Sequence, residues 1–111
     1  MENNQDEGFD LDNTAANVSG MTTSAVLGLF DGKINTKQKI SSRLRRKPDT
    51  VKYHLSKLKD LELIEEVGEH SKGESKKYKL TLKGEKVLER VHVPETEEVR
   101  KQYYGGNSNQ K

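Results

Sequence analysis

The stretch KPDTVKYHLSKLKDLELIEE, residues 47–66, decides how this chain folds. Between residues 51 and 61 its apolar positions recur at intervals of four, three and three, which places them on one side of an α-helix. These positions are Val51, Leu55, Leu58 and Leu61. Pro48 suits the first helical position, where a backbone donor is not needed, and an acidic residue follows it in the first turn. The spacing therefore predicts a helix that begins near residue 48 and buries one stripe.

The opposite side of this helix faces water and carries a mixture of polar side chains. It combines a tyrosine, a serine and a lysine with two acids: Asp49, Lys52, Tyr53, Ser56 and Asp60. Lys57 lies on the flank of this face, and His54 lies beside the apolar stripe. A tyrosine that faces water without a packing role contributes little to the stability of the fold, so the outer face is a candidate binding surface.

Composition limits the chain to one small domain. With 111 residues, of which 30% are hydrophobic and 34% charged, it can bury one small core. It contains no cysteine, which excludes disulfides and thiolate chemistry. The longest apolar run, residues 25–30, is far too short to span a membrane, and the first residues lack the pattern of a secretory signal. We therefore expect a cytoplasmic protein without a membrane partner.

The formal charge of +2 conceals a separation of opposite charges along the chain. Residues 1–20 contain five acids and no base, so residues 21–111 hold 20 bases and 13 acids. Within residues 33–59 there are ten lysines or arginines and a single acid. This pattern predicts an anionic partner for the middle segment, although a lysine-rich solvated surface with no partner is the alternative.

Composition also divides the chain into three parts. Residues 1–20 mix Asn, Asp, Gly, Thr and Ser with few large apolar groups, which predicts a disordered acidic tail. Residues 21–93 carry the apolar periodicity of the folded domain. Residues 94–111 are a C-terminal extension, with room for a short helix before a disordered end at residues 105–111.

Two short helices are predicted before the helix that begins at residue 48. Apolar spacing indicates the first over residues 22–30, and an Asp-Gly pair ends it. The second is expected over residues 36–44, with Asn35 as its cap and Gln38 completing a capping-box pattern.

A hairpin and a last helix follow residue 61. Two strands are joined by a polar, glycine-bearing connection around residues 70–75, and period-two alternation places Tyr78 and Leu80 on one face of the hairpin. Helical spacing then returns over residues 82–91 and ends before Pro94. The expected fold is mainly α with a small β-hairpin (α+β), in the order helix-helix-helix-strand-strand-helix.

The second and third helices are separated by only three or four residues, and such a tight pair is typical of the helix-turn-helix. Residues 40–67, ISSRLRRKPDTVKYHLSKLKDLELIEEV, resemble the core of winged helix-turn-helix regulators, especially the ArsR-like group. In that group an isoleucine, a leucine four residues later, a Thr-Val pair, a His-Leu pair and a closing Leu-Ile recur at these distances. Residues 77–89, KYKLTLKGEKVLE, resemble the second wing strand and following helix of MarR-, PadR- and ArsR-like proteins. The resemblance covers about residues 23–91.

The resemblance implies which residues meet DNA. In these regulators the N-terminal and outer residues of the third helix reach base edges, and lysine, serine, threonine and tyrosine can contact bases or phosphates. The matching positions here are Pro48, Asp49, Thr50, Lys52, Tyr53, Ser56 and Lys57. Asp49 departs from this chemistry because it repels phosphate, so it would help only at the helix start or as an acceptor for a cytosine amine. Plain solvation of Lys52, Ser56 and Lys57 is the alternative.

Four basic residues crowd the turn between the two helices: Arg43, Arg45, Arg46 and Lys47. Related sequences usually have a glycine and a small apolar residue at positions 45 and 46. Buried guanidinium groups would need paired partners, so both arginines are expected to point outward as phosphate clamps, with a steep salt dependence of binding. The wing lysines Lys72, Lys76 and Lys77 are expected to reach the adjacent backbone or minor groove, although many soluble hairpins are equally lysine-rich.

No catalytic or metal site is predicted. The only histidines, His54, His70 and His92, lie on different elements, and no carboxylate pair has metal-ligand spacing. The metal sites of ArsR-like sensors therefore do not carry over, and no cofactor is expected. No serine or threonine has a histidine base at a suggestive distance, so the chain is not expected to be an enzyme. Gly84 fits a strand-to-helix junction better than a phosphate loop.

These features predict sequence-specific binding of double-stranded DNA by a prokaryotic or archaeal transcription regulator that represses by occluding a promoter. Two alternatives stay open, a protein-docking winged helix within a larger assembly and an RNA-binding winged helix. A core of about seventy residues without disulfides is marginal, so we also expect a homodimer. A two-fold dimer would place its two reading helices about 34 Å apart, one turn of DNA.

Overall fold

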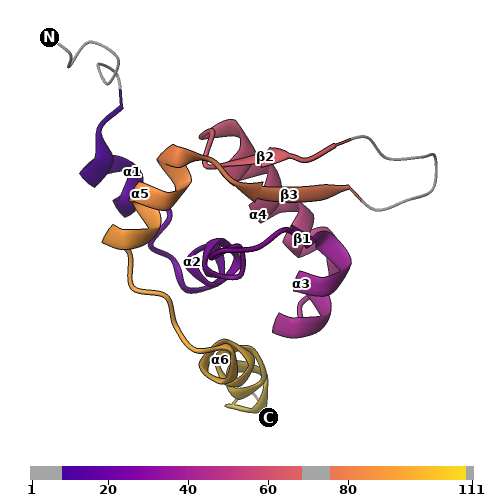
Figure 1. The fold of residues 1–111 in the computed structure, drawn as a ribbon. Helices are drawn as coiled ribbons and strands as arrows, with labels where there is room; N and C mark the ends of the chain where they lie inside the picture. Colours follow the sequence, from indigo (N-terminus) through magenta and orange to yellow (C-terminus); the bar gives the residue numbers. More distant parts are fainter. Residues whose placement is uncertain (1–8, 69–75, 110–111) are drawn as a thin grey trace, which may run out of the picture.

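The structure is a computed structural model that describes residues 9–68 and 76–109, and within those ranges it contains six helices and three short strands (Figure 1). The helices are α1 (Leu11–Asn17), α2 (Met21–Gly28), α3 (Lys37–Leu44), α4 (Pro48–Asp60), α5 (Leu82–Arg90) and α6 (Thr96–Asn109). The strands are β1 (Asn35–Thr36), β2 (Ile64–Glu66) and β3 (Lys77–Leu80). The predicted α+β class is confirmed, and the predicted order holds from α2 to α5. Helix α1 and strand β1 are additions to it, and α6 lies in the C-terminal extension where a short helix was expected.

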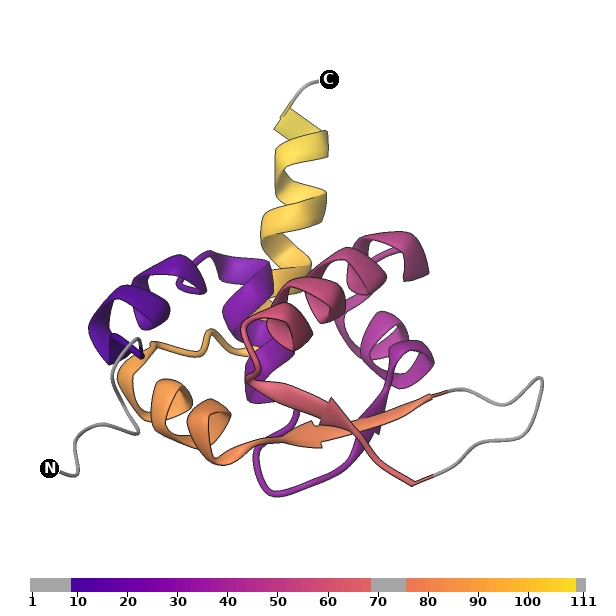
Figure 2. The same cartoon turned by 90° about the horizontal axis from the view of Figure 1, so that it is seen from above.

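The three strands form one antiparallel sheet in the order β1-β3-β2. Strands β2 and β3 are the predicted hairpin, and Figure 2 shows them leading away from the helices on one side of the molecule. In β3, Tyr78 and Leu80 are half-buried while Lys77 and Lys79 are exposed, as the alternation predicts. Strand β1 pairs through Asn35 opposite Tyr78, and its two residues are too few to show a period in the sequence.

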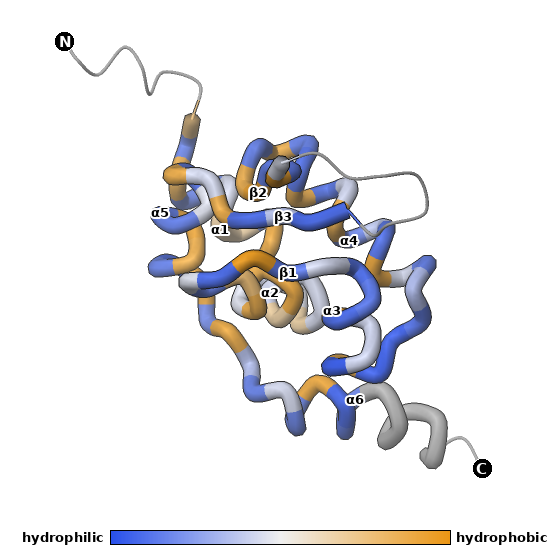
Figure 3. The backbone as a smooth tube through the Cα atoms, turned by 45° about the vertical axis from the view of Figure 1, so that its right-hand side comes forward, coloured by the Kyte–Doolittle hydropathy of each residue, from blue (hydrophilic) through white to orange (hydrophobic). Residues whose placement is uncertain are grey.

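Apolar side chains from α2, α3, α4 and the first strand of the hairpin meet in one core. The predicted stripe of α4 lies in it, with Val51, Leu55 and Leu58 buried. The largest fully buried side chains are Phe30, Leu27, Ile40, Leu44, Leu58, Leu63 and Ile64. In Figure 3 β3 and much of α3 are coloured hydrophilic, in contrast to the buried segments. Only one side of each of these two elements is covered by the core. Burial of one such side chain contributes about 1.5–3 kcal/mol, so the buried stripe of α4 contributes strongly to holding this helix on the core.

Residues 10–18 differ from the disordered tail that their composition predicts. The carboxylate of Asp10 caps α1 by accepting a hydrogen bond from the backbone N–H of Asn13 (3.1 Å). Ala15, inside α1, and Val18, just after it, are both buried in the core. The sequence does contain this signal, since apolar residues recur at helical spacing, but the two buried side chains are small and easily overlooked.

Helix α1 is held in place by α5, which lies beside it (Figure 1). An ion pair between Asp12 and Arg90 joins the two helices. Two of the five acids of residues 1–20 are therefore engaged, Asp10 as a cap and Asp12 with Arg90. The boundary expected at residue 20 falls within packed structure, while residues 1–8 lie outside the described residues.

Helix α3 is capped by Thr36 and not by the predicted Asn35. The hydroxyl of Thr36 accepts a hydrogen bond from the backbone N–H of Lys39 (3.2 Å). Asn35 is buried, and its amide nitrogen donates to the carbonyl of Leu29 (3.0 Å) while its amide oxygen accepts from the N–H of Thr36 (2.9 Å). The cap shifts by one residue because the Asn35 side chain is already used to hold the loop before β1.

The C-terminal extension forms a longer helix than predicted. Helix α6 continues to Asn109, so residues 105–109 are helical where a disordered end was expected. Val99 of α6 is fully buried, and α6 packs on α2 and α3 (Figure 1). Residues 110–111 lie outside the described residues.

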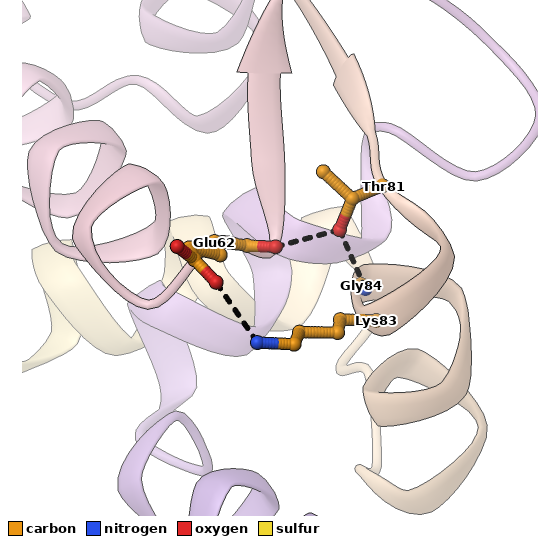
Figure 4. A network of polar contacts seen from close by, with 4 residues as sticks. All are labelled: Glu62, Thr81, Lys83 and Gly84. Carbon is orange, nitrogen blue, oxygen red and sulfur yellow. Dashed lines mark hydrogen bonds and ion pairs between the residues drawn. The ribbon is translucent and has the colours of Figure 1, made fainter. Parts of the chain in front are cut away.

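A small polar network fixes the start of α5 against the base of the hairpin (Figure 4). The Thr81 hydroxyl donates to the carbonyl of Glu62 (2.6 Å) and accepts from the N–H of Gly84 (3.0 Å). Lys83 donates to the Glu62 carboxylate (2.9 Å), and this hydrogen bond lowers the pKa of Glu62. A Cβ atom at Gly84 would lie 2.0 Å from the carbonyl oxygen of Leu63, so the close approach of α5 explains the glycine.

Candidate nucleic-acid interface

Helices α3 and α4 form a helix-turn-helix joined by residues 45–47. Arg45 occupies the C-cap of α3 in the left-handed conformation, with φ 55° and ψ 47°. Glycine adopts this conformation without strain, which explains why related sequences usually have glycine at this position. Pro48 then begins α4 at the position expected for it.

The outer face of α4 is open to solvent along its length. Lys52, Tyr53 and Ser56 are exposed, and the tyrosine is 64% exposed. Pro48 and Asp49 are also exposed at the start of α4, whereas Thr50 and Lys57 are half-buried on its flanks. The face thus presents an amine, a phenol and a hydroxyl in neighbouring turns, which are donors suited to base edges and phosphates.

His54 connects this face to the helix behind it. Its Nδ1 lies 2.9 Å from the hydroxyl oxygen of Thr23 in α2, and its ring meets the Tyr53 ring edge-on at 5.2 Å between centroids. Burial lowers the pKa of His54 from its ordinary value of 6.5, and the charges of Lys57 and Arg46 lower it further. The ring is therefore a half-buried, hydrogen-bonded structural group, which agrees with its predicted position beside the apolar stripe, and it supports the position of Tyr53.

A groove of about 420 Å³ runs beside the outer face of α4. Tyr53, Ser56 and Lys57 line it on the α4 side, together with Asp60 and Leu61. Asn17, the last residue of α1, closes it on the other side. Sequence reasoning missed Asn17 because it assigned α1 to a disordered tail.

The four basic residues of the turn do not all point to solvent. Arg43, Arg45 and Lys47 are exposed, as expected for phosphate contacts. Arg46 is half-buried, and its Nη2 donates to the backbone carbonyl of Val99 in α6 (3.1 Å). The expectation that Arg46 points outward is therefore wrong. Its partner is a main-chain carbonyl that lies 53 residues further along the chain, which local sequence could not reveal.

The wing contributes two described lysines. Lys77 is exposed on β3, and Lys76 is exposed with its amine 3.7 Å from the Glu66 carboxylate. An exposed pair of this kind contributes little and is readily exchanged for another anion. Lys72 lies outside the described residues, as does His70.

Neither a metal-ligand cluster nor a membrane-spanning helix is found among the described residues. Within residues 9–68 and 76–109, no three histidine or acidic residues lie close enough together to hold a metal ion. Over the same part of the chain, no helix has both the length and the apolar content to cross a membrane.

Comparison with solved structures identifies the fold. No protein-family model matches the chain, and no curated protein matches its sequence. Among solved structures, a mutant of ZitR from Lactococcus lactis is 29% identical over 62% of this chain and 47% of its own, with a TM-score of 0.55. ZitR is described as a zinc-responsive MarR family member. Wild-type ZitR in complex with DNA is 26% identical, with 82% of this chain and 61% of that chain covered and a TM-score of 0.55.

A second group of neighbours comes from the PadR family. PadR from Bacillus subtilis, in complex with operator DNA, is 25% identical over 79% of this chain and 60% of its own, with a TM-score of 0.54. The chain thus has the winged helix-turn-helix fold found in MarR- and PadR-family transcription regulators. It spans about half the length of the ZitR chain with which it shares 29% identity. The more specific resemblance to the ArsR-like group stays a prediction.

Proposed function

We propose that this protein binds double-stranded DNA sequence-specifically and regulates transcription, with α4 in the major groove. The observation that supports this most is the outer face of α4, the second helix of the helix-turn-helix, which is solvent-exposed and carries Lys52, Tyr53 and Ser56. Structural neighbours with the same fold include DNA complexes of ZitR and PadR. Phosphate contacts would come from Arg43, Arg45, Lys47 and the wing lysines Lys76 and Lys77, while Arg46 supports the turn.

Repression by promoter occlusion is the simplest mechanism that a single winged-helix domain provides. The described residues contain one small domain, and a winged helix that covers a promoter excludes polymerase without any further activity. A homodimer would double the interface and place two copies of α4 about 34 Å apart on the same side of the DNA. Sedimentation at tens of micromolar tests the dimer, because a single 12.6 kDa species would contradict it.

The proposed function is tested with a duplex selected from a randomised pool by binding to the full chain. Tyr53→Ala and Lys52→Ala should each weaken binding to this duplex by about 1–3 kcal/mol while leaving the unfolding midpoint unchanged. Lys86→Ala is the matched control, since Lys86 is exposed on α5, away from α4.

Competitor arms separate the alternatives. A salt titration with duplex DNA, duplex RNA and a neutral polymer should show preference for DNA and a steep loss of affinity with salt. Equal affinity for RNA would support the RNA-binding alternative. Failure to select any duplex, or unchanged affinity in a folded Lys52→Ala/Tyr53→Ala double variant, would leave α4 as a protein-docking surface.

A further inference from the structure

A second pocket, of about 540 Å³, lies between the loop before β1, the outer side of α3 and the first turns of α6. Helices α3 and α6 pack side by side at this place (Figure 1). Its volume lies within the usual range of ligand pockets, about 300–1,000 Å³. None of the described residues that line it belongs to α4, so the pocket is separate from the outer face of α4.

Four cationic side chains from three parts of the chain converge on this pocket. Lys33 comes from the loop before β1, Lys39 and Arg43 lie one turn apart on α3, and Arg100 comes from α6. No acidic residue is among the described residues that line the pocket. Folding brings these like charges together, so they repel one another, and an anion held among them would remove that repulsion and be attracted by all four.

The guanidinium of Arg100 is fixed in place before any ligand arrives. Its Nε donates to the backbone carbonyl of Arg43 (2.8 Å), and its side chain is only 26% exposed. The nearest carboxylate, on the 76% exposed Glu97, lies 3.9 Å from its Nη1, which is too far for a hydrogen bond. The outer nitrogens therefore keep donors for an anion, and little side-chain freedom is lost when they bind one.

The surroundings of the cations favour a phosphate group. A phosphate offers several acceptor oxygens and up to two charges, which match two guanidinium groups that bind in forked geometry and two amines. Ser42 adds a hydroxyl on the same side of α3. Ile34, which is 49% exposed, provides an apolar edge against which the carbon atoms next to a phosphate can lie.

We propose that this pocket binds a phosphate group. The group belongs either to a free small molecule or to a stretch of DNA backbone beyond the bases that α4 would contact. Binding would also join α6 to α3 through Arg100 and Arg43, so it would stabilise the packing of the C-terminal helix on the helix-turn-helix.

The test compares two double variants of the full chain. Lys33→Gln with Lys39→Gln removes two pocket cations that are not among the DNA contacts proposed above, and Lys86→Gln with Lys101→Gln removes the same charge from exposed positions that do not line the pocket. Circular dichroism first confirms that both variants fold. In the first arm, inorganic phosphate is titrated at constant ionic strength while backbone amide shifts are followed by NMR. In the second arm, binding to a DNA duplex is measured at several salt concentrations.

The proposal predicts saturating phosphate-induced shifts in residues 33–43 and at Arg100 in the wild type and the control. The pocket variant should bind about tenfold more weakly. If the pocket variant also loses more DNA affinity than the control, with a salt slope smaller by about 2, the phosphate belongs to DNA. If DNA binding is equal in the two variants while phosphate binding differs, the ligand is a free molecule. Equality of the two variants in both arms overturns the proposal, and the phosphate arm contains no DNA, so it does not depend on the proposed function.

Discussion

Arg46 donates a hydrogen bond to the backbone carbonyl of Val99 (3.1 Å), and this bond joins the turn of the helix-turn-helix to the C-terminal helix. Arg100, one residue further along α6, returns a bond to the carbonyl of Arg43 (2.8 Å). The turn after α3 therefore donates a hydrogen bond to α6, and α6 donates one back to the last turn of α3. This connection makes α6 part of the helix-turn-helix scaffold and not an independent extension.

Replacement of Arg46 by methionine should destabilise the fold. The variant keeps most of the aliphatic stem but removes the donor to Val99, and a hydrogen bond from a charged group contributes about 1.5–3 kcal/mol. We expect the free energy of unfolding in urea to fall by about 1.5–3 kcal/mol. Lys47→Met is the control, because Lys47 is exposed and makes no side-chain cap. Equal losses in the two variants would mean that the bond to α6 contributes nothing measurable.

Arg45→Gly should stabilise the protein. Arg45 is held at φ 55°, where a residue with a Cβ atom is strained by about 1 kcal/mol relative to glycine. The melting temperature should rise accordingly. The same change at Lys47, whose φ is −62°, should lower stability, because there glycine only adds freedom to the unfolded chain. A melting temperature that falls in both variants would contradict the assigned backbone conformation.

Val18→Ala tests whether the segment before α2 is packed structure or a tail. Val18 is fully buried, so loss of two methyl groups and the cavity left behind should cost about 2 kcal/mol. Asn17→Ala is the neighbouring control, since Asn17 is exposed. In a disordered tail the two substitutions would be equally silent, and that result would refute α1 as part of the core.

His54 should make stability depend on pH. Burial lowers its folded-state pKa below 6.5, so the unfolded chain binds the proton more readily. Its contribution to stability is therefore complete above pH 6.5 and is lost as the pH falls below that value toward the lower folded pKa. Urea midpoints measured from about pH 8 to 5 should decline in the wild type and decline less in His54→Gln.

The control for this pH series is His92→Gln, because His92 is exposed. It should follow the wild type across the whole range. Parallel curves for wild type and His54→Gln would show that other groups, and not His54, set the acid sensitivity.

Local sequence was sufficient wherever one face of an element repeats over several turns. The stripe Val51, Leu55 and Leu58 predicted α4, its buried side and hence its exposed outer face, all of which the structure confirms. The same reasoning placed Tyr78 and Leu80 on the inner face of β3. In both cases the period alone decides which side chains are covered.

The features that sequence reasoning missed depend on contacts between distant residues. Whether Arg46 points to solvent is decided by the position of Val99, and Asn35 is withdrawn from its capping role by the Leu29 carbonyl. Helix α1 needs α5 beside it, because a helix of seven residues with small apolar side chains is not stable alone. The phosphate pocket was hidden for the same reason, since Arg100 meets Lys39 and Arg43 only after α6 has packed on α3.

The missing side chain at Gly84 sets a limit on how this protein can vary. Even the methyl group of alanine at this position would collide with the Leu63 carbonyl oxygen, and that oxygen cannot move because it accepts a hydrogen bond from the Thr81 backbone N–H (3.0 Å). In a library that samples every residue at each site, position 84 should therefore be among the least tolerant in the chain, while the adjacent exposed Glu85 accepts most replacements. Such a library would mark the junction of wing and helix by its intolerance alone, without reference to any ligand.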